Sequence, residues 1–241
     1  MEEGAATWIL EGEPTPGDRG GTHGLGVFET MLAVDGSIVS AHWHGERLLE
    51  GCRVLDLAVP DWSEVIDAIE VRLAGHRGRW RVRVARTAGA GSLNRLRGRG
   101  ERTYVTVAPC ADVPLTLRVA TASWARNESS PLRGVKCLSY AENLLALDEA
   151  RRGGVDELIF FNTRGELCEG ATTNVYLEIQ GQLQTPPLTS GCLPGTFRRG
   201  LLESGRAEER VLTRREVGAA ERIFLSSATR GLVRVSEWIG F

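Results

Sequence analysis

The chain has 241 residues, enough to bury a substantial hydrophobic core in one large domain or two small ones. Hydrophobic residues make up 42% and charged residues 25% of the chain, as in an ordinary soluble globular protein. The formal net charge is only −2 despite 29 basic residues, so bulk electrostatics do not indicate a nucleic-acid partner.

Cysteine usage and hydropathy indicate the cellular location of the protein. The cysteines are odd in number, widely spaced and without a CxxC pair: Cys52, Cys110, Cys137, Cys168 and Cys192. This usage argues against a disulfide framework and predicts a reducing, cytoplasmic location. The opening MEEGAATWIL is acidic and unlike a signal peptide, and no apolar run approaches the length of a membrane span. We therefore expect no membrane partner.

The first part of the chain mixes strand and helix patterns. Runs rich in β-branched and aromatic residues predict strands over 7–12, 27–34, 37–40, 79–87 and 102–109. Asp35-Gly36 joins the second and third of these runs and is a strong hairpin signal. Apolar residues at helical spacing predict helices over 42–57 and 62–75, the second capped near Asp61.

A proline-framed stretch, APCADVP, predicts a linker at 110–115. It divides the chain into an N-terminal domain over 1–109 and a C-terminal domain over 116–241. Beyond the linker, the predicted strands are 115–123, 156–162, 166–170, a hairpin over 172–188 that turns at Gln180-Gly181, and two strands within 221–238. The predicted helices are 139–154 and 195–205. Hairpins mixed with a few helices in both parts indicate two α+β domains.

Lys136 is the only lysine, and the other 28 of the 29 basic residues are arginine. Compositional drift towards arginine explains the count if the surviving lysine is accidental. Alternatively, chemistry holds this position, because an ε-amine can act as a nucleophile, a base or a Schiff-base former and guanidinium cannot. Lys136 lies between a predicted strand and a predicted helix, a position that suits a residue at a cleft.

Other features suit a phosphorylated cofactor. Glu169 lies at a strand end, and LPGTF leads into a helix whose first N–H groups would suit a phosphate. The loop SSATRG offers hydroxyl donors at Ser226, Ser227 and Thr229, and Arg47 could supply a counter-charge. An amine, a carboxylate and a phosphate cradle together favour pyridoxal phosphate, whose aldehyde bonds to a lysine and whose ring nitrogen pairs with a carboxylate.

Several segments resemble the class IV aminotransferases, the fold-type IV pyridoxal-phosphate enzymes. They are DRGGTHGLGVFET, HGERL, the long VKCLSYAENLLALDEARRGGVDELIFFNTRGELCEGATTNVYL, TPPLTSGCLPGTFR and FLSSATRG. The family includes branched-chain and D-amino acid aminotransferases and 4-amino-4-deoxychorismate lyases. The resemblance implies a two-domain α+β fold of the D-amino acid aminotransferase type, with the cofactor between the domains, and a homodimer.

The resemblance also implies roles for particular residues. Lys136 would form the Schiff base, Glu169 would pair with the pyridine nitrogen, and Arg47 would bind the phosphate. Further phosphate donors would be Gly195, Thr196, Phe197 and Thr229. A threonine is common in the family where Phe197 stands, so one hydroxyl contact is missing here. Tyr140 could reach the phenolic oxygen of the cofactor, or it could serve helix packing.

The reaction is less sharply indicated than the cofactor. The segment ARTAGAGSL lacks the Arg-x-His carboxylate trap of the D-amino acid enzymes, and RWRVRVART lacks the Arg-Pro pair of the branched-chain enzymes. Both features favour a 4-amino-4-deoxychorismate lyase, which forms 4-aminobenzoate and pyruvate, with a transaminase of branched-chain or D-amino acids as the alternative. Thr30 could protonate the leaving group or be an ordinary strand residue.

A non-catalytic ligand-binding protein and a metal-binding protein are the other classes of function to consider. A non-catalytic ligand-binding relative would have no reason to retain Lys136 against drift. The sequence HWH places His42 and His44 at a spacing that could chelate a metal, but no third ligand is in view, and surface histidines fit better.

Overall fold

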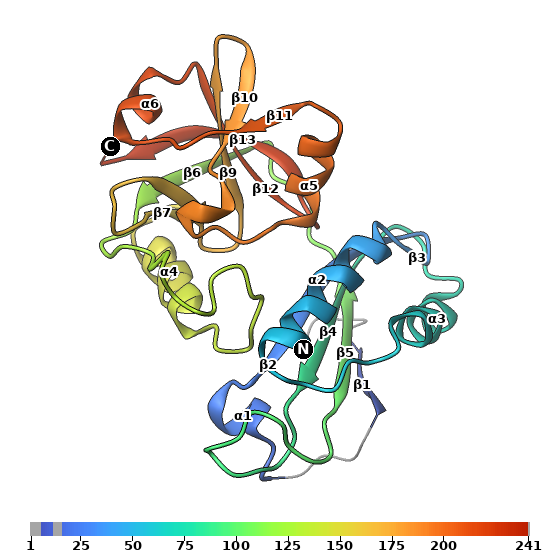
Figure 1. Ribbon diagram of the computed structural model, residues 1–241. Coiled ribbons are helices and arrows are strands. Elements are labelled where there is room, and N and C mark those ends of the chain that lie inside the picture. The colour runs from blue at the N-terminus through green and yellow to red at the C-terminus, as the bar shows by residue number, and fades with distance from the viewer. Residues whose placement is uncertain (1–5, 12–15, 241) are drawn as a thin grey trace. The chain divides into compact units, whose positions relative to one another are not determined.

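The computed structural model describes residues 6–11 and 16–240 (Figure 1). The backbone divides into two compact units. The first unit comprises Met1–Asp112 and Val135–Tyr140, and the second unit comprises Val113–Gly134 and Ala141–Phe241.

The first unit is built on a five-stranded antiparallel sheet among the described residues, in the order β1-β5-β4-β2-β3. The strands are β1 (Ala6–Glu11), β2 (Gly26–Val34), β3 (Ser37–Ile38), β4 (Arg79–Thr87) and β5 (Thr103–Pro109). The predicted hairpin at Asp35-Gly36 is confirmed between β2 and β3, and both turn residues have positive φ, 49° and 90°. An Asp-Gly pair adopts that conformation at little cost.

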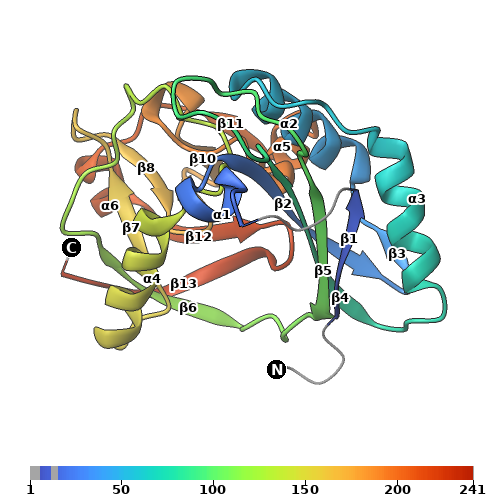
Figure 2. The ribbon, with the colours of Figure 1, turned by 90° about the horizontal axis from the view of Figure 1, so that it is seen from below.

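Helices cover one face of this sheet (Figures 1 and 2). They are α2 (Ala41–Val54) and α3 (Trp62–Leu73), whereas the short helix α1 (Arg19–His23) lies beside the end of β4, where Gly20 meets Thr87. The core forms because the apolar stripes of α2 and α3, such as Leu48 and Ile69, pack on the alternate strand positions Val82 and Val84. The predicted cap is confirmed, since the Asp61 carboxylate accepts hydrogen bonds from the N–H groups of Ser63 and Glu64.

The second unit contains an eight-stranded mixed sheet among its described residues, in the order β11-β10-β9-β12-β13-β6-β7-β8. Its strands are β6 (Thr116–Thr121), β7 (Glu157–Phe161), β8 (Leu167–Gly170), β9 (Asn174–Ile179), β10 (Gln182–Thr185), β11 (Ala207–Glu209), β12 (Arg222–Ser227) and β13 (Gly231–Ile239). The predicted turn at Gln180-Gly181 is confirmed, with φ of 53° and 75°. β6 lies between β13 and β7 and is parallel to both.

Three helices and a 3₁₀ turn complete the second unit: α4 (Ala141–Arg152), η1 (Leu188–Ser190), α5 (Thr196–Glu203) and α6 (Arg214–Ala219). Ala146 and Ala150 of α4 pack with Phe160 of β7, and Leu201 of α5 packs with Tyr176 of β9. These contacts hold α4 and α5 against the sheet, and the start of each helix borders a segment singled out in the sequence.

The segment with the only lysine differs from expectation. We expected Lys136 to belong to the C-terminal domain, but Val135–Tyr140 belongs to the first unit. The reason is backbone pairing with β2: the N–H of Phe28 donates to the carbonyl of Lys136 at 2.9 Å, and that of Leu138 donates to Gly26 at 2.8 Å. A Cβ at position 26 would lie 2.6 Å from Leu138 Cδ1, so glycine permits this close approach.

Four short elements were not predicted: α1, η1, β11 and α6. α1 lies in a glycine-rich stretch for which no helix was predicted, and the Asp18 carboxylate caps its first turn by accepting a hydrogen bond from the N–H of Gly20 at 2.8 Å. α6 begins with a capping box formed by Thr213 and Glu216. Among residues 6–11 and 16–240, no helix has the length and apolar character needed to cross a bilayer.

Candidate active site

Lys136 presents its amine to an aromatic surface within the first unit. Its Nζ lies 4.4 Å from the ring centroid of Phe28 and 5.4 Å from that of Tyr140. The two rings meet edge to face, with centroids 5.1 Å apart. Phe28 is buried, so it gives the amine a fixed apolar platform. The structure therefore brings Lys136 and Tyr140 together and adds Phe28 to the two residues named from the sequence.

Arg83 is a second cation on the same platform, and sequence reasoning missed it. Its Cζ lies 4.2 Å from the Phe28 ring centroid. Arg79, Arg81 and Arg83 alternate along β4 with the core residues Val82 and Val84, so the arginines share the opposite face of the sheet. Burial lowers the pKa of Arg83 from its usual value, and the nearby Arg81 acts in the same direction. The alternation of arginine and valine was the signal that could have found it.

Arg47 points to a buried carboxylate. Its Nε donates to Glu29 Oε1 at 2.7 Å and its Nη2 donates to Glu29 Oε2 at 2.6 Å, while His44 Nδ1 lies 2.7 Å from Oε2. Glu29 is fully buried and Arg47 is 10% exposed. Burial opposes ionisation of Glu29, but the charge and hydrogen bonds of Arg47 outweigh it and lower the pKa of Glu29 to about 2. Arg47 is therefore held rigidly in the first unit.

Glu169, the expected partner of the pyridine nitrogen, lies in β8 of the second unit. Its Oε2 accepts a hydrogen bond from the N–H of Leu193 at 2.8 Å. Its Oε1 lies 3.2 Å from Nε of Arg126, a buried arginine whose Cζ stacks 4.1 Å from the Phe160 ring centroid. These contacts favour the ionised carboxylate, because each places positive charge or an N–H dipole beside it.

The expected phosphate donors at 195–197 form the start of α5. Gly195 is the N-cap, and no side chain caps the helix. The first turn of a helix carries unpaired N–H groups and the positive end of the dipole, so it suits an anion. Thr196 is buried at this start and Phe197 is partly buried. A Cβ at Gly195 would overlap Asn174 Oδ1, so only glycine fits there without displacement.

The loop after β12 carries Thr229, the last expected donor. Its Oγ1 lies 3.5 Å from Ser227 Oγ, and the N–H of Arg230 donates to that hydroxyl at 3.3 Å. The Arg230 side chain lies 3.4 Å from Glu157, a fully buried carboxylate that also accepts from Thr172 and Thr173. Burial raises the pKa of Glu157, an effect that Thr172 and Arg230 oppose. Glu157, which sequence reasoning missed, ties the loop of Thr229 to the loop after Glu169.

The fit at α5 gives a first prediction. Gly195→Ala will push Asn174 away from the helix start, weaken pyridoxal-phosphate binding, and cost about 1–3 kcal/mol of stability, as overpacking does. Gly21→Ala is the control, because nothing lies within 4 Å of a Cβ there. Cofactor titration and urea unfolding measure both effects. Equal cofactor affinity in the two variants would contradict the role of this helix start.

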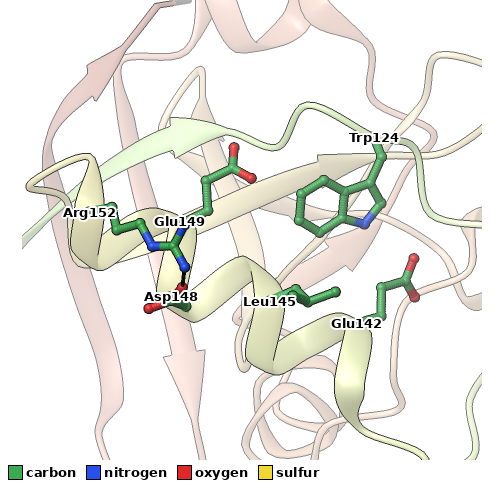
Figure 3. A pocket seen from close by; sticks show the side chains of 6 residues that line it. All are labelled: Trp124, Glu142, Leu145, Asp148, Glu149 and Arg152. Atoms are coloured by element: carbon green, nitrogen blue, oxygen red, sulfur yellow. Dashed lines mark ion pairs between the residues drawn. The ribbon is translucent and has the colours of Figure 1, made fainter.

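A pocket of about 460 Å³ lies on α4 in the second unit (Figure 3). Its lining is Trp124, Glu142, Leu145, Asp148, Glu149 and Arg152. None of these is an expected site residue, and Asp148 pairs with Arg152 across one turn of α4. Within the described part of the chain, no group of three histidine, cysteine or acidic residues could hold a metal ion. His42 is exposed and its ring lies tilted beside that of Trp43, but the expectation of a surface position is wrong for His44, which is buried and bonds to Glu29.

Comparison with known proteins identifies the family. The overall architecture is the α+β fold of the fold-type IV transaminases. Residues 26–238 match the sequence profile of Amino-transferase class IV, and the chain belongs to this family. A bifunctional aminodeoxychorismate lyase and D-amino acid transaminase of Mycobacterium tuberculosis is 32% identical over 215 residues, which cover 79% of this chain and 72% of the relative.

Two solved structures show the same fold. The branched-chain aminotransferase of Thermoproteus uzoniensis has a TM-score of 0.85 at 27% identity, covering 97% of this chain and 87% of that one. A hypothetical aminotransferase from Mycobacterium tuberculosis in its pyridoxal-phosphate-bound form has a TM-score of 0.84 at 27% identity, covering 98% and 91%. The protein is therefore a pyridoxal-phosphate-dependent enzyme.

The residues of this chain fit that cofactor. The amine of Lys136 lies on aromatic rings, Glu169 is a positioned carboxylate, and α5 begins without a side-chain cap. A planar ring, a protonated nitrogen and a phosphate are the groups that such a donor set accommodates.

Proposed function

We propose that this enzyme is a 4-amino-4-deoxychorismate lyase, which splits its substrate into 4-aminobenzoate and pyruvate. The observation that carries this proposal is the sequence RTAGAGSL at the end of β4, which has no histidine of an Arg-x-His trap. A relative with the lyase activity in its name, 32% identical, supports it. Its second named activity keeps transamination of D-amino acids as the alternative.

We propose that the expected cofactor residues act as the resemblance implies. Lys136 would hold pyridoxal phosphate covalently and Glu169 would hold its ring nitrogen. Arg47, Gly195, Thr196, Phe197 and Thr229 would hold its phosphate. When bound, the cofactor supplies an aldehyde that bonds to amines and a ring that withdraws electrons. Tyr140 packs against Phe28, and its hydroxyl would face the phenolic oxygen.

The residues of the chain then have distinct tasks. Lys136 Nζ removes the proton from the substrate carbon that bears the nitrogen, and Phe28 and Tyr140 hold the amine in place for this step. Arg83 lies over the same Phe28 ring and would bind a substrate carboxylate, for which a guanidinium fork is suited. Thr30 is opposite Arg83 in the β2–β4 register and shares its face, so it remains a proton donor for the leaving group in this proposal.

The assay that tests the proposal supplies the purified enzyme either with 4-amino-4-deoxychorismate or with an amino acid and a 2-oxo acid. We expect 4-aminobenzoate and pyruvate in equal amounts from the first mixture. New amino acid from the second mixture, without 4-aminobenzoate from the first, would contradict the lyase and support the transaminase. No product from either mixture would contradict both.

Arg83 gives a more specific prediction. Arg83→Met will raise KM for a carboxylate substrate roughly 10–100-fold, as expected when a hydrogen bond to a charged group is lost. Arg81→Met is the matched control, because Arg81 lies two residues before Arg83 on the same face of β4. Steady-state kinetics of both variants measure the difference. Equal KM values would remove Arg83 from the substrate site.

We also propose a cytoplasmic homodimer. The five cysteines are free thiols, which supports a reducing compartment. Leu144 and Leu145 are 59% and 63% exposed on α4, which supports an apolar contact with a second copy. Light scattering of the purified chain would show a mass of twice 26.3 kDa, whereas the monomer mass would contradict the dimer.

A further inference from the structure

Arg126 is a buried cation beside the carboxylate expected to act on the cofactor ring. It lies on the segment before Glu128, and its backbone N–H donates to the carbonyl of Phe161 at 2.9 Å. The residue is 9% exposed. Its Nη1 donates to Glu142 Oε2 at 2.7 Å, its Nε lies 3.2 Å from Glu169 Oε1, and Phe160 stacks beneath it. All these groups belong to the second unit.

The hydrogen bonding of Arg126 is incomplete for a purely structural arginine. Its Nε and Nη2 are buried and have no hydrogen-bond partner among the described residues. Nε is close enough to Glu169 for strong electrostatic attraction, but it is not aligned for a hydrogen bond. Buried donors normally find acceptors, and leaving them without one is costly. Arg126 therefore interacts with Glu169 through electrostatic attraction and not through a hydrogen bond.

Glu169 is held from two sides. The Arg126 guanidinium faces Oε1, and the Leu193 N–H binds Oε2. A positive charge within about 4–6 Å favours the ionised form of a carboxylate, and so does a donated backbone hydrogen bond. Only an ionised carboxylate can stabilise a proton on the ring nitrogen. The positive charge of Arg126 also repels the proton on the ring nitrogen, which offsets part of the stabilisation by Glu169.

We propose that Arg126 is a positioning residue, which keeps Glu169 ionised and oriented and thereby sets how strongly the site holds the protonated ring nitrogen of pyridoxal phosphate. The proposal rests on the proposed role of Glu169. Arg126 acts through Glu169 and has no role at the reacting carbon. Glu142, its other carboxylate partner, is 49% exposed in the wall of the α4 pocket and would leave the function of Glu169 intact (Figure 3).

The test compares two cofactors on the full-length chain. One is pyridoxal phosphate, and the other is its analogue with carbon in place of the ring nitrogen. Arg126→Met and Arg126→Gln, which remove the charge in apolar and polar form, should weaken binding of pyridoxal phosphate roughly tenfold. Neither should change binding of the carbon analogue by more than about twofold. Arg126→Lys, which keeps a positive charge, should retain most of the preference for the nitrogen-containing cofactor. Glu142→Gln is the matched control and should behave like the wild type.

The outcomes distinguish failure of the inference about Arg126 from failure of the proposed role of Glu169. Equal loss of affinity for both cofactors in Arg126→Met or Arg126→Gln would show a structural role and overturn the inference. Unchanged affinity for both would overturn it as well. Glu169→Gln is measured in parallel: if it does not distinguish the cofactors, the proposed role of Glu169 itself fails. If it does distinguish them and the Arg126 variants do not, only the inference fails. Unfolding curves of the cofactor-free variants show whether each variant is folded. If only one of Arg126→Met and Arg126→Gln folds, that variant is sufficient for the test.

Discussion

Lys136→Arg will reduce turnover by at least roughly 10²–10⁴-fold, the contribution typical of a positioned general base. Arginine keeps the positive charge next to Phe28, so the chain should fold normally. Its guanidinium cannot lose a proton or bond to the cofactor aldehyde, so the visible absorption of the bound cofactor should also be lost. Steady-state kinetics and absorption spectra measure the two effects.

The arginine-rich composition offers a matched control for this variant. Arg133→Lys with Lys136→Arg moves the single lysine three residues along the chain and leaves composition and net charge unchanged. We expect this double variant to be as inactive as Lys136→Arg. Turnover within tenfold of the wild type in either variant would mean that Lys136 is an accident of composition.

Glu29→Gln will destabilise the protein by about 3 kcal/mol at pH 7, because it removes the buried negative charge that Arg47 and His44 contact. The figure agrees with the shift in pKa from 4.5 to about 2, at about 1.4 kcal/mol per unit. Glu50→Gln is the control, because Glu50 pairs with Arg53 on the exposed side of α2 and such a pair contributes at most about 1 kcal/mol.

The stabilisation by Glu29 will depend on pH. The folded-state pKa is depressed, so the contribution is fully present above the unfolded value of about 4.5 and is lost as the pH falls towards about 2. Urea unfolding of wild type and Glu29→Gln should therefore show the full difference at pH 7 and a smaller one at pH 3. A difference that stays constant over this range, or is absent at pH 7, would contradict the account.

Local rules predicted much of the fold. The turns at Asp35-Gly36 and Gln180-Gly181 need residues that tolerate positive φ, and Asp61 caps the helix that follows it. The elements that were missed are short, and their stability comes from neighbours more than from propensity. α6 is the exception, because Thr213 and Glu216 stand at the spacing of a capping box. The pairing of segment 135–140 with β2 joins residues about a hundred positions apart, which no local pattern reveals.

In the candidate site, too, some residues could be named from the sequence and others only from the structure. The single lysine and the family segments were sufficient to name Lys136, Glu169 and Arg47. The residues that support them were not named, because Glu29, Arg83 and Arg126 look like ordinary strand or loop charges in the sequence. Their roles depend on what they meet: Glu29 meets Arg47, Arg83 meets Phe28, and Arg126 meets Glu169. Such contacts require the folded chain.

The most direct test of the central claim is the mass of the peptide that contains Lys136. The purified protein is incubated with pyridoxal phosphate, treated with borohydride to make the bond to the amine permanent, digested and analysed by mass spectrometry. We expect one added cofactor mass on Lys136 and none elsewhere in the chain. Cofactor on the N-terminal amine alone, or on no residue, would contradict the assignment of Lys136.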